Sequence, residues 1–420
     1  MERLQTLLGH LSTSSGQGEV RCCETAASER EDDVVIVAAL RTPICKAKRG
    51  NLRETYEDDL LATVFTGVLN QTKIDPVLLG DICVGSVLQE GAGADTARMA
   101  QFYSGIPETT PLSAVNRQCS SGLQAVMNLA GSIRNGVCDI GLAAGVESMS
   151  RRSMNRGKVD INPKVFENEK ASQCLIPMGI TSENVATRFG VSRKNQDLFA
   201  YQSHMRAAKA RQTGLFREEI VPVRTKITDK DGEAKEIMVY EDDGIRPTTT
   251  LEGLSKLKPA FQEGGSTTAG NSSQLSDGAA AVLLAKRSAA LRHGLPILGV
   301  ILSYAVVGVP PDVMGIGPAV AIPEALRKAG LKKEDIEIFE INEAFASQCL
   351  YCVEKLGLPQ DKVNPNGGAI ALGHPLGCTG ARQIATLLHE LKRRGKRAYG
   401  VVSMCIGTGM GAAAVLEYPG

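Results

Sequence analysis

The sequence predicts an α/β protein built from two units of one plan, each with mostly parallel sheets covered by helices. Short apolar runs, which are typical of buried strands, alternate with amphipathic helical stretches along most of the 420 residues. The order of these elements in the first unit recurs in the second at an offset of roughly 254–260 residues, which indicates an internal repeat.

The composition excludes several classes of function. The net charge is +1 and the charged residues are well mixed, so we expect no nucleic-acid partner. The basic run at 392–397 is better explained as the end of a solvated helix. No apolar run reaches the roughly 18–20 residues that span a bilayer, so we expect no membrane partner. The 11 cysteines lack regular spacing and a secretory leader, which favours reduced thiols inside the cell.

Residues 1–32 are predicted to be a targeting leader. A helix there would carry four leucines on one face: Leu4, Leu7, Leu8 and Leu11. With Arg3 and His10 beside that face, the segment resembles the N-terminal peroxisomal import signal: a basic residue, an aliphatic residue, any five residues, His or Gln, then Leu or Ala. A mitochondrial presequence is the alternative, but the acidic residues of the leader argue against it.

The first unit begins at Asp33. Its expected elements are strands at 34–40, 81–88 and 140–144, a helix at 56–69, a second helix directly after Cys119, and a turn at 145–148. Residues 151–265 are richer in charge and are interpreted as an insertion over this unit. The insertion should contain a helix at 194–212 and a hairpin at 221–240, before a strand at 279–285 returns to the first core.

The second unit repeats this order. Strands are expected at 298–304, 335–340 and 399–404, and the segment 377–382 falls where Cys119–Gly122 fell in the first unit. We therefore divide the chain into the leader 1–32, an N-terminal domain 33–292 that contains the insertion 151–265, and a C-terminal domain 293–420.

Cys119 lies at or just before a helix N-terminus. The free N–H groups and the positive end of the helix dipole favour an anion, so the thiol should ionise more easily than a free one. The alternative is a buried, inert cysteine, because cysteine is among the most buried residue types. Only partners elsewhere in the chain can decide between the two.

Three further segments carry candidate groups on turns at the ends of strands or helices. They contain Asn342, His374 and Cys405. Taken singly, Asn342 could cap a helix and His374 could satisfy a turn. The glycines at 407–411 have the wrong spacing and position for a dinucleotide loop. Of the other histidines, His10 belongs to the leader, and three lie on polar helical stretches without an assigned role: His204, His293 and His389. The Cys349-x-x-Cys352 pair is assigned to packing.

These motifs together resemble the thiolase family over about Asp33 to Pro419. They read NRQCSSG at 116–122, NEAF at 342–345, GGAIALGHP at 367–375 and CIGTGMG at 405–411. The resemblance implies the thiolase fold: two βαβαβαββ halves in a layered αβαβα arrangement, with a loop domain inserted in the first half.

The resemblance also implies roles. Cys119 matches the nucleophile, His374 its activating base, and Cys405 the second cysteine that acts as general acid and base. Asn342 matches the residue that holds a water in one oxyanion hole. The backbone N–H groups of Cys119 and Gly407 match the other hole.

Further positions match residues that bind coenzyme A and the acyl group. Arg246 matches a contact of the nucleotide phosphate and Ser273 a contact of the pantetheine arm. Three apolar residues are also assigned to the substrate: Met178, Met314 and Phe345. Two departures from the family stand out. Pro177 replaces the histidine of short-chain members, which argues against a strict acetoacetyl-CoA enzyme, and Thr408 replaces a glycine and is expected to be tolerated.

The implied activity is cleavage of 3-oxoacyl-CoA by coenzyme A in the peroxisomal matrix, at the last step of fatty-acid β-oxidation. Coenzyme A is a substrate, and no metal or bound cofactor is implied. The partners implied are a second copy of the chain, in a homodimer, and the peroxisomal import receptor. The alternatives are an acetyl-CoA acetyltransferase that runs toward condensation and a non-catalytic acyl-CoA carrier. A β-ketoacyl synthase shares the fold but lacks the second catalytic cysteine.

Overall fold

The computed structural model describes residues 30–154, 161–228 and 231–420. One compact unit spans Glu31–Gly420. The import-signal pattern at residues 3–11 lies outside the described residues.

The centre of the fold is a ten-stranded sheet whose two halves follow the same plan. Its order is β10-β11-β12-β9-β1-β8-β5-β3-β4, with the short β2 paired to β8. The first-half strands are β1 (Val34–Arg41), β2 (Cys45–Lys46), β3 (Asp81–Gly85), β4 (Leu112–Val115), β5 (Ile140–Ser148) and β8 (Ser276–Lys286). The second-half strands are β9 (Gly299–Gly308), β10 (Ile336–Ile341), β11 (Ala398–Ile406) and β12 (Met410–Tyr418). Among the described strands of this sheet, a short β1–β9 pairing connects the two halves, at Val35 with Val300 and Ile36 with Gly299.

The expectation of mostly parallel sheets is wrong. Among the described strands, β3–β4, β3–β5 and β10–β11 pair in parallel, and the other pairings of this sheet are antiparallel. The cause is a returning strand in each half: β8 lies between β1 and β5, and β12 lies between β9 and β11. The expected turn at 145–148 is also wrong, because β5 continues to Ser148 in register with β8.

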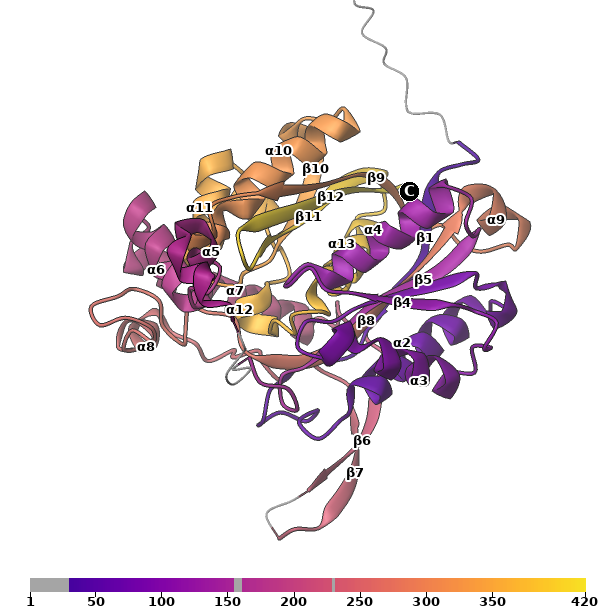
Figure 1. The fold of residues 1–420 in the computed structure, drawn as a ribbon, viewed down its shortest axis with the longest axis horizontal. Coiled ribbons are helices and arrows are strands. Elements are labelled where there is room, and N and C mark those ends of the chain that lie inside the picture. The colour runs from indigo at the N-terminus through magenta and orange to yellow at the C-terminus, as the bar shows by residue number, and fades with distance from the viewer. Residues whose placement is uncertain (1–29, 155–160, 229–230) are drawn as a thin grey trace, which may run out of the picture. The chain divides into compact units, whose positions relative to one another are not determined.

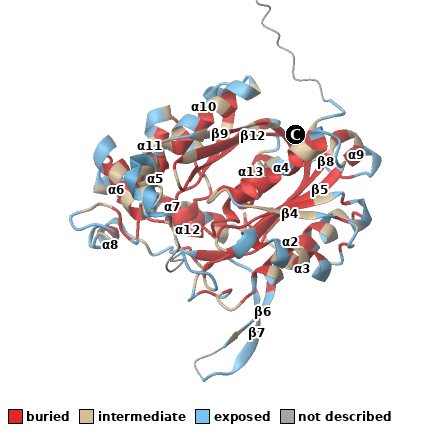
Figure 2. Cartoon of the chain, viewed as in Figure 1, coloured by how far each residue is buried: buried red, intermediate tan, exposed pale blue. Residues whose placement is uncertain are grey.

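The helices form the outer and central layers of an αβαβα stack (Figure 1). Outside the first half lie α2 (Glu57–Thr72) and α3 (Ala94–Tyr103). Outside the second half lie α10 (Gly317–Ala329) and α11 (Ala346–Leu356). Between the two half-sheets lie α4 (Ser121–Arg134) and α13 (Thr379–Arg393), whose apolar residues share one buried cluster with strands of both halves (Figure 2). Each half-sheet is therefore covered on both faces.

The inserted segment follows the prediction in its main elements. Its helices are α5 (Glu169–Gln173), α6 (Met178–Phe189), α7 (Arg193–Gln212) and α8 (Leu251–Ser255), and its hairpin is β6 (Val223–Thr228) with β7 (Ala234–Val239). The Ser192 hydroxyl accepts a hydrogen bond from the Asn195 N–H, which starts α7 as an N-cap. The remaining helices are α9 (Arg287–Arg292) and α12 (Ala369–Leu372).

Across the described ranges, none of the helices combines the length and apolar character needed to cross a membrane.

Candidate active site

The loop before α4 holds Cys119 in a strained, tightly hydrogen-bonded turn. Gln118 has a φ of 46°, a left-handed conformation that non-glycine residues rarely adopt. The Ser121 hydroxyl donates to the Gln118 carbonyl at 2.6 Å, and the Ser120 N–H donates to the Arg117 carbonyl at 3.1 Å. Such strain persists only where the surrounding structure fixes it, and it is concentrated at functional sites.

Glycines let the first turns of α4 and α13 come into direct contact. A methyl group at Gly122 would lie 2.6 Å from the Gly377 carbonyl oxygen. A side chain at Gly145 would collide with the same oxygen, and one at Gly380 would collide with the Leu123 backbone. Cys119 precedes one of these helix starts and His374 the other, so this contact brings together turns that lie more than 250 residues apart.

His374 is fixed at both ring nitrogens and at its backbone. Its Nδ1 lies 2.6 Å from the Thr379 hydroxyl, and its Nε2 lies 3.3 Å from the Asn342 amide nitrogen. Its N–H donates to the Gln274 carbonyl. Burial and the nearby Arg382 charge lower the pKa of His374 to about 3, so the imidazole is neutral at physiological pH.

Asn342 and Cys405 lie at the carboxyl ends of the parallel neighbours β10 and β11. The Asn342 N–H donates to the Ser403 carbonyl at 2.9 Å, which joins the two strand ends. The Asn342 Oδ1 atom is buried and has no hydrogen-bond partner among the described residues. A buried acceptor that is left open in this way is suited to hold a water or a ligand.

Cys119 lies close enough to Cys405 to affect the charge of the Cys405 thiol. Burial, together with the Cys119 thiol, raises the pKa of Cys405 well above its ordinary value. Burial also raises the pKa of Cys119 to about 11, although the backbone N–H groups of Gly407 and of Cys119 itself oppose this by hydrogen bonding to the sulfur. The expectation that Cys119 ionises more easily than a free thiol is therefore wrong. The helix begins only at Ser121, and desolvation outweighs its dipole.

The three apolar residues assigned to the substrate gather beside Cys405. Met314, Phe345 and Cys405 belong to one small buried cluster, and Met178 packs against it. The Phe261 ring meets Phe345 edge-on at 6.0 Å between ring centroids. This part of the site can therefore bind an apolar chain next to a thiol.

Arg246 and Ser273 are not part of the cluster beside Cys405. Packing and backbone contacts link them to that cluster. Arg246 is exposed at the rim of a hollow of about 460 Å³ whose wall includes Leu254 and Leu257. These leucines pack on Gly270. Three residues farther on, the Ser273 N–H donates to the Ala344 carbonyl at 3.0 Å, next to Phe345.

Comparison with known proteins gives the family. The model "Thiolase, N-terminal domain" matches residues 34–288, and "Thiolase, C-terminal domain" matches residues 295–418. The chain belongs to the thiolase family. It is 66% identical to "3-ketoacyl-CoA thiolase A, peroxisomal" of Rattus norvegicus over 100% of this chain and 98% of that protein. It is 64% identical to "3-ketoacyl-CoA thiolase, peroxisomal" of Homo sapiens over the full length of both.

A solved thiolase structure has the same fold. The dimeric peroxisomal thiolase of Saccharomyces cerevisiae superimposes with a TM-score of 0.87 at 51% identity. The match covers 93% of this chain and 99% of that one. The thiolase fold predicted from the motifs is confirmed.

Two buried residues of this thiolase support the site, although the sequence predicted no role for them. Glu147 accepts hydrogen bonds from the N–H groups of Val87, Leu88 and Gly377, and so ties turns of both halves together. Burial raises its pKa to about 7, despite these bonds. His204, which was assigned no role, is buried on α7, and its Nδ1 accepts from the Arg246 N–H at 3.2 Å. The role of each residue follows from hydrogen-bond partners that are distant in the sequence, so no local motif could have predicted it.

Cys349 and Cys352 are both buried in α11, in agreement with their assignment to packing.

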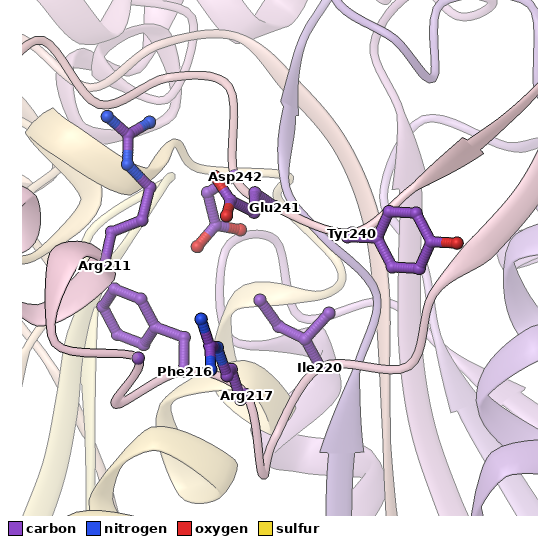
Figure 3. A pocket seen from close by; sticks show the side chains of 8 residues that line it. Arg211, Phe216, Arg217, Ile220, Tyr240, Glu241 and Asp242 are labelled. Carbon is purple, nitrogen blue, oxygen red and sulfur yellow. The ribbon is translucent and has the colours of Figure 1, made fainter.

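A separate hollow in this thiolase lies where α7 ends (Figure 3). It is lined by Arg211, Gly214, Phe216, Arg217, Ile220, Tyr240, Glu241 and Asp242. Asp242 accepts two hydrogen bonds from the buried Arg41 guanidinium, at 2.7 and 2.9 Å. The guanidinium carbon of Arg41 lies 5.2 Å from the centroid of the Phe216 ring. The hollow measures about 30 Å³, which is too small for an acyl-CoA. Its residues anchor the inserted segment on β1.

Proposed function

We propose that the chain cleaves 3-oxoacyl-CoA with coenzyme A, giving acetyl-CoA and an acyl-CoA shortened by two carbons, in peroxisomal fatty-acid β-oxidation. The arrangement that supports the proposal has three parts. Cys119 lies near Cys405, His374 lies beside Asn342, and the turns that follow Cys119 and His374 are in contact at Gly122 and Gly377. Relatives named as peroxisomal 3-ketoacyl-CoA thiolases support the substrate class and a peroxisomal location.

The first half-reaction uses Cys119 as nucleophile. Its thiol proton moves to the free Nε2 of His374 as the sulfur attacks the 3-oxo carbon. Because Cys119 is a thiol and His374 a neutral imidazole at rest, the proton transfer accompanies the attack. The C2–C3 bond then breaks, and its electron pair stays on the acetyl-CoA carbanion. The Cys405 thiol protonates that carbanion, which leaves acetyl-CoA, a Cys405 thiolate and acyl-Cys119.

The second half-reaction returns the enzyme to its starting state. The Cys405 thiolate takes the proton of the incoming coenzyme A thiol. The coenzyme A sulfur attacks the acyl carbon, the bond to the Cys119 sulfur breaks, and Cys119 recovers its proton from His374. A cysteine suits this cycle because its thioester keeps the acyl group ready for transfer to another thiol.

Developing negative charge on oxygen needs donors that are already in position. The backbone N–H groups of Cys119 and Gly407 both point at the Cys119 sulfur. When an acyl carbon is bonded to that sulfur, the same two groups can donate hydrogen bonds to the oxygen on that carbon. The Asn342 amide and His374 can hold a water that donates a hydrogen bond to the thioester oxygen of the acetyl-CoA carbanion.

The coenzyme A site is assigned to the path from Arg246 to Phe345. The nucleotide would lie in the 460 Å³ hollow at Arg246, and the pantetheine arm would pass Leu257 and Ser273. The thioester would then reach the cluster beside Cys405. We also assign the chain to a homodimer, supported by the dimeric yeast relative, and to import by a peroxisomal receptor.

Replacing each cysteine separately tests the two roles. Cys405→Ala should still form acyl-Cys119, detected by intact mass, but thiolysis should fall by at least about 10²–10⁴-fold, the usual contribution of a general acid–base group. Cys119→Ala should lose both acylation and turnover. Cys138→Ala, at a half-buried thiol outside the site, is the control.

Near-native turnover of Cys405→Ala would make its role structural and refute the mechanism. Assaying short, medium and long 3-oxoacyl-CoAs separates the proposal from a strict acetoacetyl-CoA enzyme. Absence of any cleavage by the wild-type chain would favour the non-catalytic carrier.

A further inference from the structure

A relay of two hydrogen bonds fixes the proton on the His374 ring. The Thr379 hydroxyl donates to the Pro375 carbonyl at 3.0 Å and lies 2.6 Å from His374 Nδ1. A hydroxyl carries one proton, so with that proton on Pro375 it can only accept from the ring. The Nδ1 atom is therefore the protonated nitrogen.

The other ring nitrogen agrees with this assignment. The Asn342 amide nitrogen, which only donates, lies 3.3 Å from Nε2. Nε2 must accept from it and is therefore unprotonated. The ring is neutral and has a single N–H, so both contacts select the same tautomer.

Resting on the proposed function, we propose that Thr379 is a positioning residue for catalysis: its hydroxyl holds His374 in the tautomer whose Nε2 is free to take the Cys119 proton. Thr379 itself touches no reacting atom. It is fully buried at the first position of α13, so the relay is part of the contact between the helix starts. In the other tautomer Nε2 would carry the proton and could not act as the base.

A purely structural role is the competing explanation, because Thr379 also begins α13. The two explanations predict different outcomes for three variants. Thr379→Val keeps the shape but loses the hydroxyl, Thr379→Ser keeps the hydroxyl but loses a methyl group, and Thr386→Val is the matched control. Thr386 is also fully buried on α13, and its hydroxyl donates to Glu219 at 3.1 Å, away from His374.

The expected result is a fall in kcat of about 10- to 100-fold for Thr379→Val, by analogy with the loss seen when the partner that orients a metal-ligating histidine is removed. KM should change less than twofold. Thr379→Ser should recover most of kcat, and Thr386→Val should match the wild type. The proposal is overturned if Thr379→Val keeps native kcat, if its defect lies only in KM, or if Thr379→Ser is as impaired as Thr379→Val.

A spectroscopic measurement keeps the test independent of turnover. The chain has five histidines, so labelling them with ¹⁵N and assigning His374 with a His374→Gln variant is practical. The wild type should show a protonated Nδ1 and an unprotonated Nε2 at neutral pH, and Thr379→Val should show a shift toward the opposite tautomer. A wild-type Nε2–H would overturn the inference. If the wild type cleaved no 3-oxoacyl-CoA, the proposed function would fail while these spectra still decided the tautomer.

Discussion

The contact between α4 and α13 can be tested with one methyl group. Gly122→Ala places a Cβ 2.6 Å from the Gly377 carbonyl oxygen and 3.1 Å from the Ala381 nitrogen. Ordinary contact begins at 3.4 Å, so the turn and the helix must separate by about 0.8 Å. Both neighbouring atoms belong to the backbone, and no flexible side chain can absorb the shift. Overpacking of this kind costs about 1–3 kcal/mol of unfolding free energy.

The same shift should impair catalysis. Cys119 lies three residues before Gly122, and His374 lies three residues before Gly377, so a separation of the two turns moves the nucleophile away from its base. A misplacement of about 1 Å can cost about 10²-fold, and we expect kcat to fall by about 10- to 100-fold.

Gly131→Ala is the matched control on the same helix. A methyl group there meets nothing within 4 Å, so the change should stabilise α4 by about 0.5–1 kcal/mol and leave kcat unchanged. Thiolysis at saturating substrate and urea midpoints would be measured for both variants. If Gly122→Ala resembled Gly131→Ala in both assays, the close contact would have no role in stability or catalysis.

Three other predictions follow from the structure and the sequence. Thr408 has a φ of 71°, so Thr408→Gly should raise the unfolding free energy by about 1 kcal/mol, and a lower urea midpoint would contradict this. Because the pKa of Cys119 is raised to about 11, its alkylation rate should keep rising about tenfold per pH unit beyond pH 9, since only the thiolate reacts. Peptide mapping would measure that rate beside the rate of the half-exposed Cys174, and a plateau near pH 8.5 would refute the pKa. Residues 1–32 fused to a fluorescent reporter should give a peroxisomal pattern that Leu4→Arg disperses, whereas a mitochondrial pattern would show that the signal is misassigned.

Periodicity predicted most elements but not how the strands pair. The runs at 34–40 and 279–285 are apolar along their whole length, and both were recognised as buried strands, now β1 and β8. Such runs carry no information about direction, so the antiparallel returns of β8 and β12 were missed. The turn expected at 145–148 began at Gly145. That glycine is there because a side chain would collide with the Gly377 carbonyl, a partner that is distant in the sequence.

The site shows the same division between local and long-range information. Cys119, His374 and Cys405 belong to local motifs with unusual residue combinations, so the sequence could suggest them. The charge state of Cys119 depends on desolvation of its thiol in the folded chain, which raises the pKa and opposes the helix effect that the sequence suggested. Glu147 is an ordinary residue in a strand until its partners from two distant turns are known.

The internal repeat explains why only one half carries the nucleophile. Helices α4 and α13 begin at Ser121 and Thr379, 258 residues apart, so the counterpart of Cys119 is Gly377. A side chain at Gly377 would lie 2.6 Å from the Val146 carbonyl oxygen. A second nucleophile at the equivalent position would therefore destroy the contact that assembles the site.

The counterpart positions Ser121 and Thr379 share one hydrogen-bond pattern but serve different functions. Both hydroxyls donate back to a carbonyl in the preceding turn, that of Gln118 in one half and of Pro375 in the other. Only the second turn carries a histidine for the hydroxyl to orient. One local structure thus shapes the nucleophile loop in the first half and sets the tautomer of the base in the second. The two functions meet because the glycines allow the two helix starts to touch.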